Sequence, residues 1–405
     1  MRILIVSQWF QPEPHFKGLA FAKALQNRGH EVEVLTGFPN YPGGKLYDGY
    51  RLRAIQTEVM DGISVKRGYL FPSHDHSALR RIANYMSFAM STTLIAFALK
   101  KPDVVYVYTP PMTAALAPVA LRLFRRVPYL CDIQDLWPDT LAATGMINNR
   151  RLLGWIGRWT DFVLRRADRV VVLSDGFAER LRARGIAPAR LAVVPNWAPP
   201  EIVEIARSLP MPASCGAGAF TILFAGNMGK AQGLETVIRA ASLLQERRAD
   251  IHFALIGGGV EVDRLKSAAA AAGLRNLDFH APRHPSMMGE MFANADALLV
   301  HLRDDPLFEI TIPSKTQAYL AIGRPILLGV RGDAARMVEQ AGAGVSFAPE
   351  DALALADAAM RLAALPADTL AQMGEAGRRF YHERLSFEAG VTAIETQLRA
   401  AAGSP

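Results

Sequence analysis

Short runs of β-branched residues alternate with amphipathic stretches along the first half of the chain. The runs predict strands at Ile3–Ser7, Glu31–Thr36, Val104–Tyr108, Tyr129–Asp132 and Val170–Ser174, with a further one at Ala192–Pro195. The spacing of apolar residues between them predicts helices at Gly18–Asn27, Leu79–Lys100, Met112–Phe124, Leu152–Arg166 and Gly176–Arg184. Continuous apolar strands joined by helices are typical of a parallel sheet that is covered on both faces.

A stretch rich in Pro and Gly at 198–219 interrupts this pattern, with one short helix predicted at Ile202–Leu209. The alternation then restarts, with strands expected at Phe220–Ala225, Phe253–Ile256, Asp278–His280, Ala297–His301, Pro325–Gly329 and Val345–Phe347. Helices are expected between them at Leu234–Gln245, Val262–Ala272, Thr316–Ile322 and Ala352–Ala364. We therefore predict an α/β fold of two facing, doubly wound, Rossmann-like domains at 1–198 and 219–385. A linker at 199–218 joins them, a helix at 386–405 is expected to pack back on the first domain, and the cleft between the domains is the expected ligand site.

The stretch Ile82–Leu99 carries no charge and is flanked by paired basic residues. Eighteen residues is the lower limit for a membrane span. A buried helix between two strands, a helix at a membrane surface and a true span are all compatible with it. Polar residues within the stretch and the strand that follows favour the buried helix.

Composition excludes several classes of protein. The 405 residues are 50% hydrophobic and 20% charged, which is ordinary globular usage. Only two cysteines occur, Cys131 and Cys215, so a disulfide framework is excluded and a reducing compartment is favoured. His74 and His76 share one loop without a third ligand nearby, and we predict no bound metal. The apolar run at the start is too short for a signal peptide, and we predict that it forms a buried strand.

Charge is distributed unevenly along the chain. Residues 1–200 hold 26 Lys and Arg against 15 Asp and Glu, whereas the remainder holds 19 against 23. A basic half indicates an anionic partner, such as nucleic acid, phospholipid head groups or a diphosphate, unless the charges only solvate helix faces. No nucleic-acid-binding motif is present, so nucleic acid is not expected.

Two glycine-rich loops follow strands of the second half. Gly226, Asn227 and Gly229 follow one strand, with Lys230 beside them, and Gly257 and Gly258 follow the next. Glycines let backbone amides approach a phosphate closely. Each loop alone is weak evidence and is more compatible with a tight structural turn, but two in one domain, each at the carboxyl end of a strand, favour phosphate binding. The loop after the first strand has only Gly18, so a dinucleotide cofactor is not expected there.

A third element is the segment that runs from Glu309 to Thr316. Its Ser314 and Lys315 open a predicted helix, whose N-terminus and added positive charge suit a diphosphate. The alternative is a helix cap by Ser314 with a solvated lysine.

Six motifs in order carry a resemblance to a known family. The chain resembles retaining glycosyltransferases of family 4, which have the GT-B fold, and is most similar to the branch that builds colanic acid and O-antigen with N-acetyl-fucosamine-type sugars. The motifs are MRILIVSQWFQPE at the start, Gly29–Val32, Asp132–Pro138, Pro195–Trp197, Ala225–Gly229 and Ile312–Lys315.

The resemblance implies a nucleotide-sugar in the second domain and a lipid-linked glycan acceptor in the first. Glu309 inherits the contact to the donor sugar, and Gln317 stands where a ribose-binding Glu is usual. Neutral Asn227 and Gln232 replace the basic residues usual at the diphosphate, so Lys230 and Lys315 are expected to supply the charge. On the acceptor side, Gln134 replaces a usual His and Asp135 matches the Asp after it, with Gly18 facing the same cleft.

We therefore expect a metal-independent, retaining transferase that needs no cofactor. Its donor would be a UDP-N-acetyl-6-deoxyhexosamine or a similar sugar nucleotide. It would act on the cytoplasmic face of the plasma membrane, held there by its basic residues. Two alternatives remain open: a nucleotide-sugar 2-epimerase of the same fold, and a non-catalytic subunit that binds sugar nucleotides.

Overall fold

The computed structural model describes residues 1–405 except 74–77, 144–145, 148, 210–218, 248–249 and 404–405. His74, His76 and Cys215 therefore lie outside the described residues, whereas Cys131 is a buried free thiol. Two compact units make up the chain: Met1–Pro195 together with Gly390–Pro405, and Asn196–Ala389. We call them unit 1 and unit 2.

Unit 1 is built on an eight-stranded sheet in the order β3-β4-β2-β1-β5-β6-β7-β8. The strands are β1 (Arg2–Val6), β2 (Glu31–Gly37), β3 (Ile55–Met60), β4 (Ile63–Gly68), β5 (Val104–Thr109), β6 (Tyr129–Ile133), β7 (Arg169–Val172) and β8 (Leu191–Val193). All neighbours pair in parallel except β3 and β4. These two form a hairpin that was not predicted, turning at Asp61 and Gly62, which both adopt positive φ.

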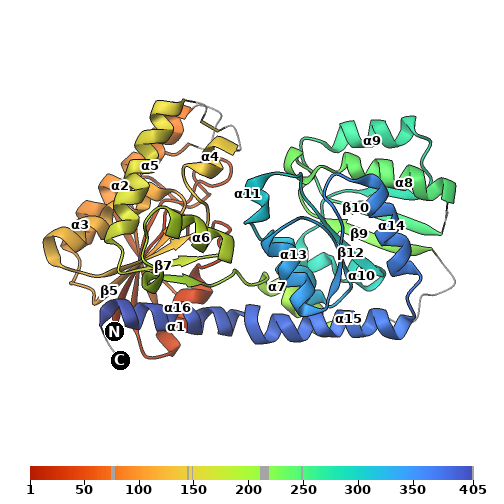
Figure 1. The fold of residues 1–405 in the computed structure, drawn as a ribbon. Coiled ribbons are helices and arrows are strands. Elements are labelled where there is room, and N and C mark those ends of the chain that lie inside the picture. Colours follow the sequence, from red (N-terminus) through yellow and green to blue (C-terminus); the bar gives the residue numbers. More distant parts are fainter. Residues whose placement is uncertain (74–77, 144–145, 148, 210–218, 248–249, 404–405) are drawn as a thin grey trace. The chain divides into compact units, whose positions relative to one another are not determined.

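Helices connect the parallel strands of unit 1, as expected for βαβ units (Figure 1). They are α1 (Leu19–Asn27), α2 (Ala78–Ala98), α3 (Leu116–Arg125), α4 (Asp139–Ala143), α5 (Arg150–Arg166) and α6 (Asp175–Ala183). The helix predicted from Met112 begins as a 3-10 turn, Met112–Ala115, and becomes α-helical only at Leu116.

Helix α2 corrects one prediction. It buries Phe88, Thr92 and Ala96, but Leu79, Met90 and Leu94 are 60% exposed or more. The prediction of a buried helix was therefore wrong for one face, because apolar residues surround this helix and the sheet covers only part of it. No helix in the described part of the chain combines the length and apolarity needed to cross a membrane.

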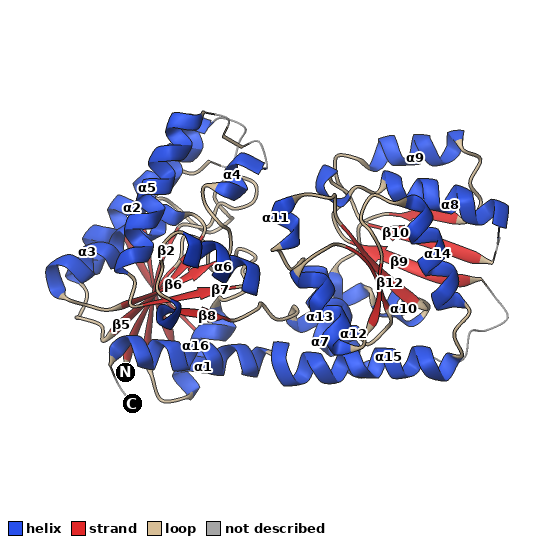
Figure 2. Cartoon of the chain, viewed as in Figure 1, coloured by secondary structure: helices blue, strands red, loops and turns tan. Residues whose placement is uncertain are grey.

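Unit 2 contains a six-stranded sheet in the order β11-β10-β9-β12-β13-β14, and every pair is parallel (Figure 2). The strands are β9 (Phe220–Ala225), β10 (Ile251–Ile256), β11 (Leu277–His280), β12 (Ala297–His301), β13 (Ile326–Gly329) and β14 (Gly344–Ser346). All six were predicted to within two residues of these bounds.

The helices of unit 2 outnumber those predicted. They are α7 (Pro200–Ser208), α8 (Glu235–Arg247), α9 (Val262–Ala271), α10 (Gly289–Ala293), α11 (Pro306–Glu309), α12 (Ser314–Ile322), α13 (Asp333–Ala341), α14 (Ala352–Ala363) and α15 (Ala367–Phe380). The sequence analysis missed α10, α11, α13 and α15, as it missed α4 in unit 1.

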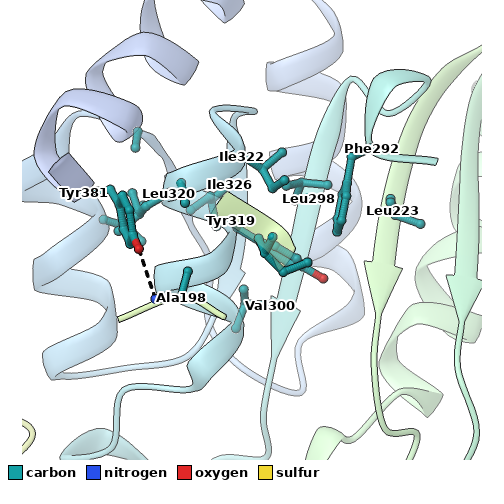
Figure 3. Close-up of a cluster of buried hydrophobic side chains, with 14 of the residues drawn as sticks. Ala198, Leu223, Phe292, Leu298, Val300, Tyr319, Leu320, Ile322, Ile326 and Tyr381 are labelled. Carbon is teal, nitrogen blue, oxygen red and sulfur yellow. Dashed lines mark hydrogen bonds between the residues drawn. The ribbon is translucent and has the colours of Figure 1, made fainter. Parts of the chain in front are cut away.

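Two buried clusters hold unit 2 together, one on each face of its sheet. The cluster drawn in Figure 3 joins strand residues such as Leu298 and Ile326 to Tyr319 and Ile322 of α12. The Tyr381 hydroxyl accepts a hydrogen bond from the Ala198 amide at 3.2 Å, which fastens the start of this unit. Helix α12 is therefore held rigidly against the sheet.

Helix α16 (Phe387–Ala402) ends the described chain, and its part from Gly390 onward belongs to unit 1. Glu395 on this part accepts hydrogen bonds from Arg28 at 2.9 Å and from Arg399 at 2.8 Å, and lies 2.9 Å from the His30 ring. Burial alone would raise its pKa, but these partners hold the pKa of Glu395 at about 2. This anionic carboxylate fastens the last helix to the residues after α1.

Candidate functional site

The two predicted glycine loops of unit 2 lie against each other. One follows β9 and the other follows β10, and these parallel strands are neighbours. The amide of Gly226 donates to the Ile256 carbonyl at 2.8 Å, and that of Met228 donates to the Gly258 carbonyl at 2.7 Å. Because carboxyl ends of parallel strands meet at one edge, the sheet brings both loops to one place.

Glycine is required at this contact. Gly226 and Gly257 have φ of 134° and 145°, a backbone conformation that is strained for any residue with a side chain. A Cβ on Gly257 would lie 1.9 Å from the Gly226 carbonyl oxygen, and one on Gly259 would lie 2.4 Å from that of Met228. The backbones of the two glycine loops therefore lie closer together than residues with a Cβ atom would allow.

Lys315, in the first turn of α12, reaches the same loops. Its Nζ lies 3.6 Å from the centroid of the Phe224 ring, and a Cβ on Gly226 would lie 2.6 Å from its Cε. Burial lowers the pKa of Lys315 to about 7. The Tyr319 hydroxyl, one turn along α12, accepts a hydrogen bond from the Ala225 amide at 3.0 Å. This hydrogen bond holds helix α12 against the start of the first glycine loop.

Lys230 and Asn227 are exposed on the same loop. The amide of Gly229 donates to the Gln232 side chain at 2.9 Å. The neutral Gln232 therefore closes the loop on itself. Lys230 is exposed to solvent, whereas Lys315 packs against Phe224.

The remaining predicted donor residues surround the N-terminus of α12. Glu309 ends α11 with an exposed side chain, and its backbone packs so closely on Gly332 that a Cβ there would meet the Glu309 carbonyl oxygen at 1.9 Å. Ser314 is exposed in the first turn of α12. Gln317 is buried, and its amide nitrogen, oriented toward the turn, donates to the Pro313 carbonyl at 2.8 Å. Gln317 thus braces the turn that presents Ser314.

The sequence analysis missed His301, which sits beneath this region at the end of β12. Its Nδ1 lies 2.6 Å from the Gln232 carbonyl, and its Nε2 accepts from the Glu350 amide at 3.1 Å. Burial lowers the pKa of His301, so the ring is neutral. A lone histidine at a strand end gave no signal of this bracing role.

Unit 1 carries a second polar cluster at the ends of β1, β5 and β6. The Nζ of Lys17 lies 2.6 Å from Asp132, and both side chains are fully buried. The Tyr106 hydroxyl donates to the same carboxylate at 2.5 Å, and Gln134 donates to its other oxygen at 2.6 Å. Of these residues the sequence analysis singled out only Gln134 as a site residue.

His15 belongs to the same region. Its Nε2 lies 2.9 Å from the Ser7 hydroxyl, and its Nδ1 accepts from the Lys17 amide at 3.0 Å. Burial and the Lys17 charge lower the pKa of His15 to about 3, so it is neutral. Gly18 is buried at the start of α1, and the Leu19 amide there donates to the Gln11 side chain instead of remaining open.

Asp135, predicted beside Gln134, is half-buried, and burial raises the pKa of its carboxyl group. It lines a cavity of about 530 Å³ within unit 1. In the described residues, no group of three or more His, Cys, Asp or Glu side chains is arranged to hold a metal ion.

The two sites differ in what they can do chemically. In unit 2, a helix N-terminus, a held lysine and two glycine loops offer positive charge and close backbone approach, which suit a phosphorylated ligand. In unit 1, the buried Lys17–Asp132 pair is internally satisfied, so it shapes the strand ends and leaves Asp135 as the acidic residue that lines a cavity.

Comparisons with known proteins agree with this division. The family model "Glycosyl transferase 4-like domain" matches residues 19–197, and the model "Glycosyl transferases group 1" matches residues 216–380. WcaI of Escherichia coli K12, named as a colanic acid biosynthesis glycosyl transferase, is 26% identical over 342 residues, covering 80% of this chain and 82% of WcaI. WbjE of Pseudomonas aeruginosa, named as a glycosyltransferase, is 25% identical over 367 residues and 88% of each chain.

Among solved structures, Anabaena HepE in complex with UDP and glucose is similar to this chain over 98% of both, with a TM-score of 0.64 and 16% identity. At that identity the likeness concerns the fold.

Proposed function

Because this chain is a glycosyltransferase of the GT-B fold, we propose that it moves a sugar from a nucleotide-sugar to a lipid-linked or growing bacterial surface polysaccharide. A glycosyl transferase 4-like domain is followed in it by a group 1 domain. The proposed donor is a UDP-N-acetyl-6-deoxyhexosamine or a similar sugar nucleotide. Transfer retains the anomeric configuration and uses neither a metal nor another cofactor.

The observation that carries this proposal is the position of Lys315 beside the two glycine loops. Lys315 is half-buried, burial lowers its pKa, and it lies over the apolar Phe224 ring with no carboxylate paired to it among the described residues, which suits a lysine that binds a diphosphate. The relatives support the assignment. HepE was solved with UDP, and WcaI is named for colanic acid biosynthesis.

The proposed mechanism follows from charge. When the bond between the anomeric carbon and the phosphate oxygen breaks, negative charge grows on the diphosphate and positive charge on the sugar ring. Lys315, Lys230 and the N-terminus of α12 stabilise the diphosphate. Glu309 contacts the sugar, while Gly226, Asn227, Gly229, Gly257, Gly258, Ser314 and Gln317 shape the donor site.

Unit 1 is the proposed acceptor domain. Asp135, Gln134 and Gly18 lie on or next to the loops at the ends of its strands. The excess of basic residues in its half of the sequence suits an anionic lipid surface at the inner face of the plasma membrane.

A thermal-shift panel of UDP-, GDP- and dTDP-sugars tests the donor, followed by transfer assays with the stabilising sugar nucleotide in the presence of EDTA. Transfer to a lipid-linked acceptor that EDTA does not change supports the proposal. Turnover of the donor without an acceptor would indicate an epimerase instead. Binding without any turnover would indicate a non-catalytic subunit.

A further inference from the structure

Unit 1 contains a cavity of about 530 Å³ between α2, α5 and the loop that follows β6. Four of the five tryptophans of the chain line it, namely Trp9, Trp137, Trp155 and Trp159. Its size and its largely apolar lining are typical of a site for a small ligand.

Aliphatic side chains make up much of the remaining wall, including Ile82, Met86 and Ile156. Charged groups are few: Arg81 is the basic residue on the lining and Asp135 the acidic one. A lining with so few charged groups suits an apolar ligand, because it offers few partners to polar atoms.

The cavity opens at the surface where α2 is apolar. Four of its lining residues are themselves exposed: Ile82 by 42%, Met86 by 43%, Met146 by 44% and Trp155 by 67%. Further along α2, Met90 and Leu94 continue the apolar surface beyond the cavity. A contiguous apolar surface of this kind is typical of a binding site.

Basic residues adjoin this apolar opening. Arg80 precedes Arg81 at the start of α2, and Arg150 and Arg151 open α5 directly before Leu152, which lines the cavity. A hydrocarbon chain that carries an anionic head group matches both features. A saccharide would match them poorly, because its many hydroxyl groups need more polar partners than this lining offers.

We propose that the cavity binds the first isoprenoid units of the acceptor's lipid, with the diphosphate of that lipid beside Arg81. This inference rests on the proposed function, since it identifies the acceptor as a polyprenyl diphosphate. In this arrangement the hydrocarbon chain occupies the cavity, and Asp135 lies where the cavity meets the ends of the strands.

Intrinsic tryptophan fluorescence tests the inference on the full chain, because four tryptophans report on the cavity. Farnesyl diphosphate serves as the probe, with inorganic diphosphate and UDP as controls. We expect a saturable change in emission with farnesyl diphosphate and not with inorganic diphosphate. Binding of the probe to the head-group charge alone would make the two titrations alike and would overturn the inference.

Two variants on one helix separate the cavity from the apolar surface around it. Met86→Glu places a carboxylate at the opening, where desolvation and repulsion are expected to weaken binding about tenfold or more. Leu94→Glu makes the same change on the exposed part of α2 outside the cavity and is expected to bind as the wild type does. Equal weakening in both variants would indicate a membrane-facing surface and would overturn the cavity as the site.

A transfer assay with a water-soluble saccharide acceptor keeps this inference separate from the proposed function. Sugar transfer without farnesyl diphosphate binding would overturn the cavity assignment and leave the transferase intact. Farnesyl diphosphate binding without transfer from any sugar nucleotide would support the hydrocarbon site and contradict the proposed reaction.

Discussion

Replacing Lys315 with methionine is expected to stabilise the protein and to abolish most of its activity. The side chain lies against Phe224, and burial lowers its pKa from 10.5 to about 7. Methionine has a similar length without the charge, so the packing against Phe224 and the glycine loops is largely kept. The two effects therefore report on the charge alone.

The magnitude follows from the pKa of Lys315. A fall in this pKa from 10.5 to about 7 means that burial disfavours the ammonium form of Lys315, relative to its neutral form, by about 5 kcal/mol. Between these pH values the unfolded chain holds a proton that the folded protein releases, so the stability of the wild type rises with pH through this window. The Lys315→Met variant should therefore exceed the wild type by as much as about 5 kcal/mol below pH 7, and the difference should vanish above pH 10.5.

Activity should change in the opposite direction. A charge that faces the leaving diphosphate is worth about 3–4 kcal/mol in the transition state, so turnover should fall about 100- to 1000-fold. Urea unfolding at pH 6 and pH 10 measures the first effect, and donor-dependent transfer measures the second. Lys266→Met, at an exposed lysine of α9, is the matched control and should change neither.

Two results would refute this reasoning. A Lys315→Met variant that is less stable than the wild type at pH 6 would mean that the ammonium group is paired rather than desolvated. Turnover within a factor of about three of the wild type would mean that the charge does not face the diphosphate.

Three further predictions concern other parts of the molecule. Glu309→Ala should lower turnover about 100-fold or more in the same transfer assay; its exposed side chain should leave the Tm unchanged, and wild-type rates would exclude it from the site. Gly257→Ala should lower the free energy of unfolding by about 3 kcal/mol or more, because its Cβ would meet the Gly226 carbonyl oxygen at 1.9 Å. It should also abolish the rise in Tm that the sugar nucleotide causes in a thermal-shift assay. Gly154→Ala, in helix α5 with nothing within 4 Å, is the control and should stabilise by about 1 kcal/mol; equal effects would show that the loop contact is not tight. Glu395→Gln should destabilise by about 1–2 kcal/mol after allowance for solvent screening. In the wild type this contribution is present above pH 4.5 and is lost as the pH falls toward 2, which acid unfolding of both proteins measures.

Much of the fold could be read from local patterns. Every strand of unit 2 and six of the eight strands of unit 1 were expected, because a strand buried on both faces must be apolar along its whole length. The hairpin of β3 and β4 was missed although Asp61-Gly62 is a strong turn signal, because polar residues alternate along both strands, of which β3 lies at the sheet edge. Short helices such as α11 were missed because one turn carries no periodicity.

The candidate donor residues were also readable, since glycine loops and Lys315 follow strands or open a helix. The charge state of Lys315 was not. It depends on Phe224 of β9 and Gly226 of the loop after it, and on the burial that they create. The bracing by His301 was equally invisible, because its partners Gln232 and Glu350 come from different loops.

The sequence by itself determined the alternation of strands and helices and the division into two halves, and it predicted candidate phosphate-binding residues, because each depends on neighbours within one turn or one strand. Only the tertiary structure decided which of these residues meet. Lys17 and Asp132 lie 115 positions apart and pair because β1, β5 and β6 are adjacent in the sheet. The order of strands results from packing the whole unit at once, so the cavity, the buried pair and the lowered pKa of Lys315 exist only after the chain has folded.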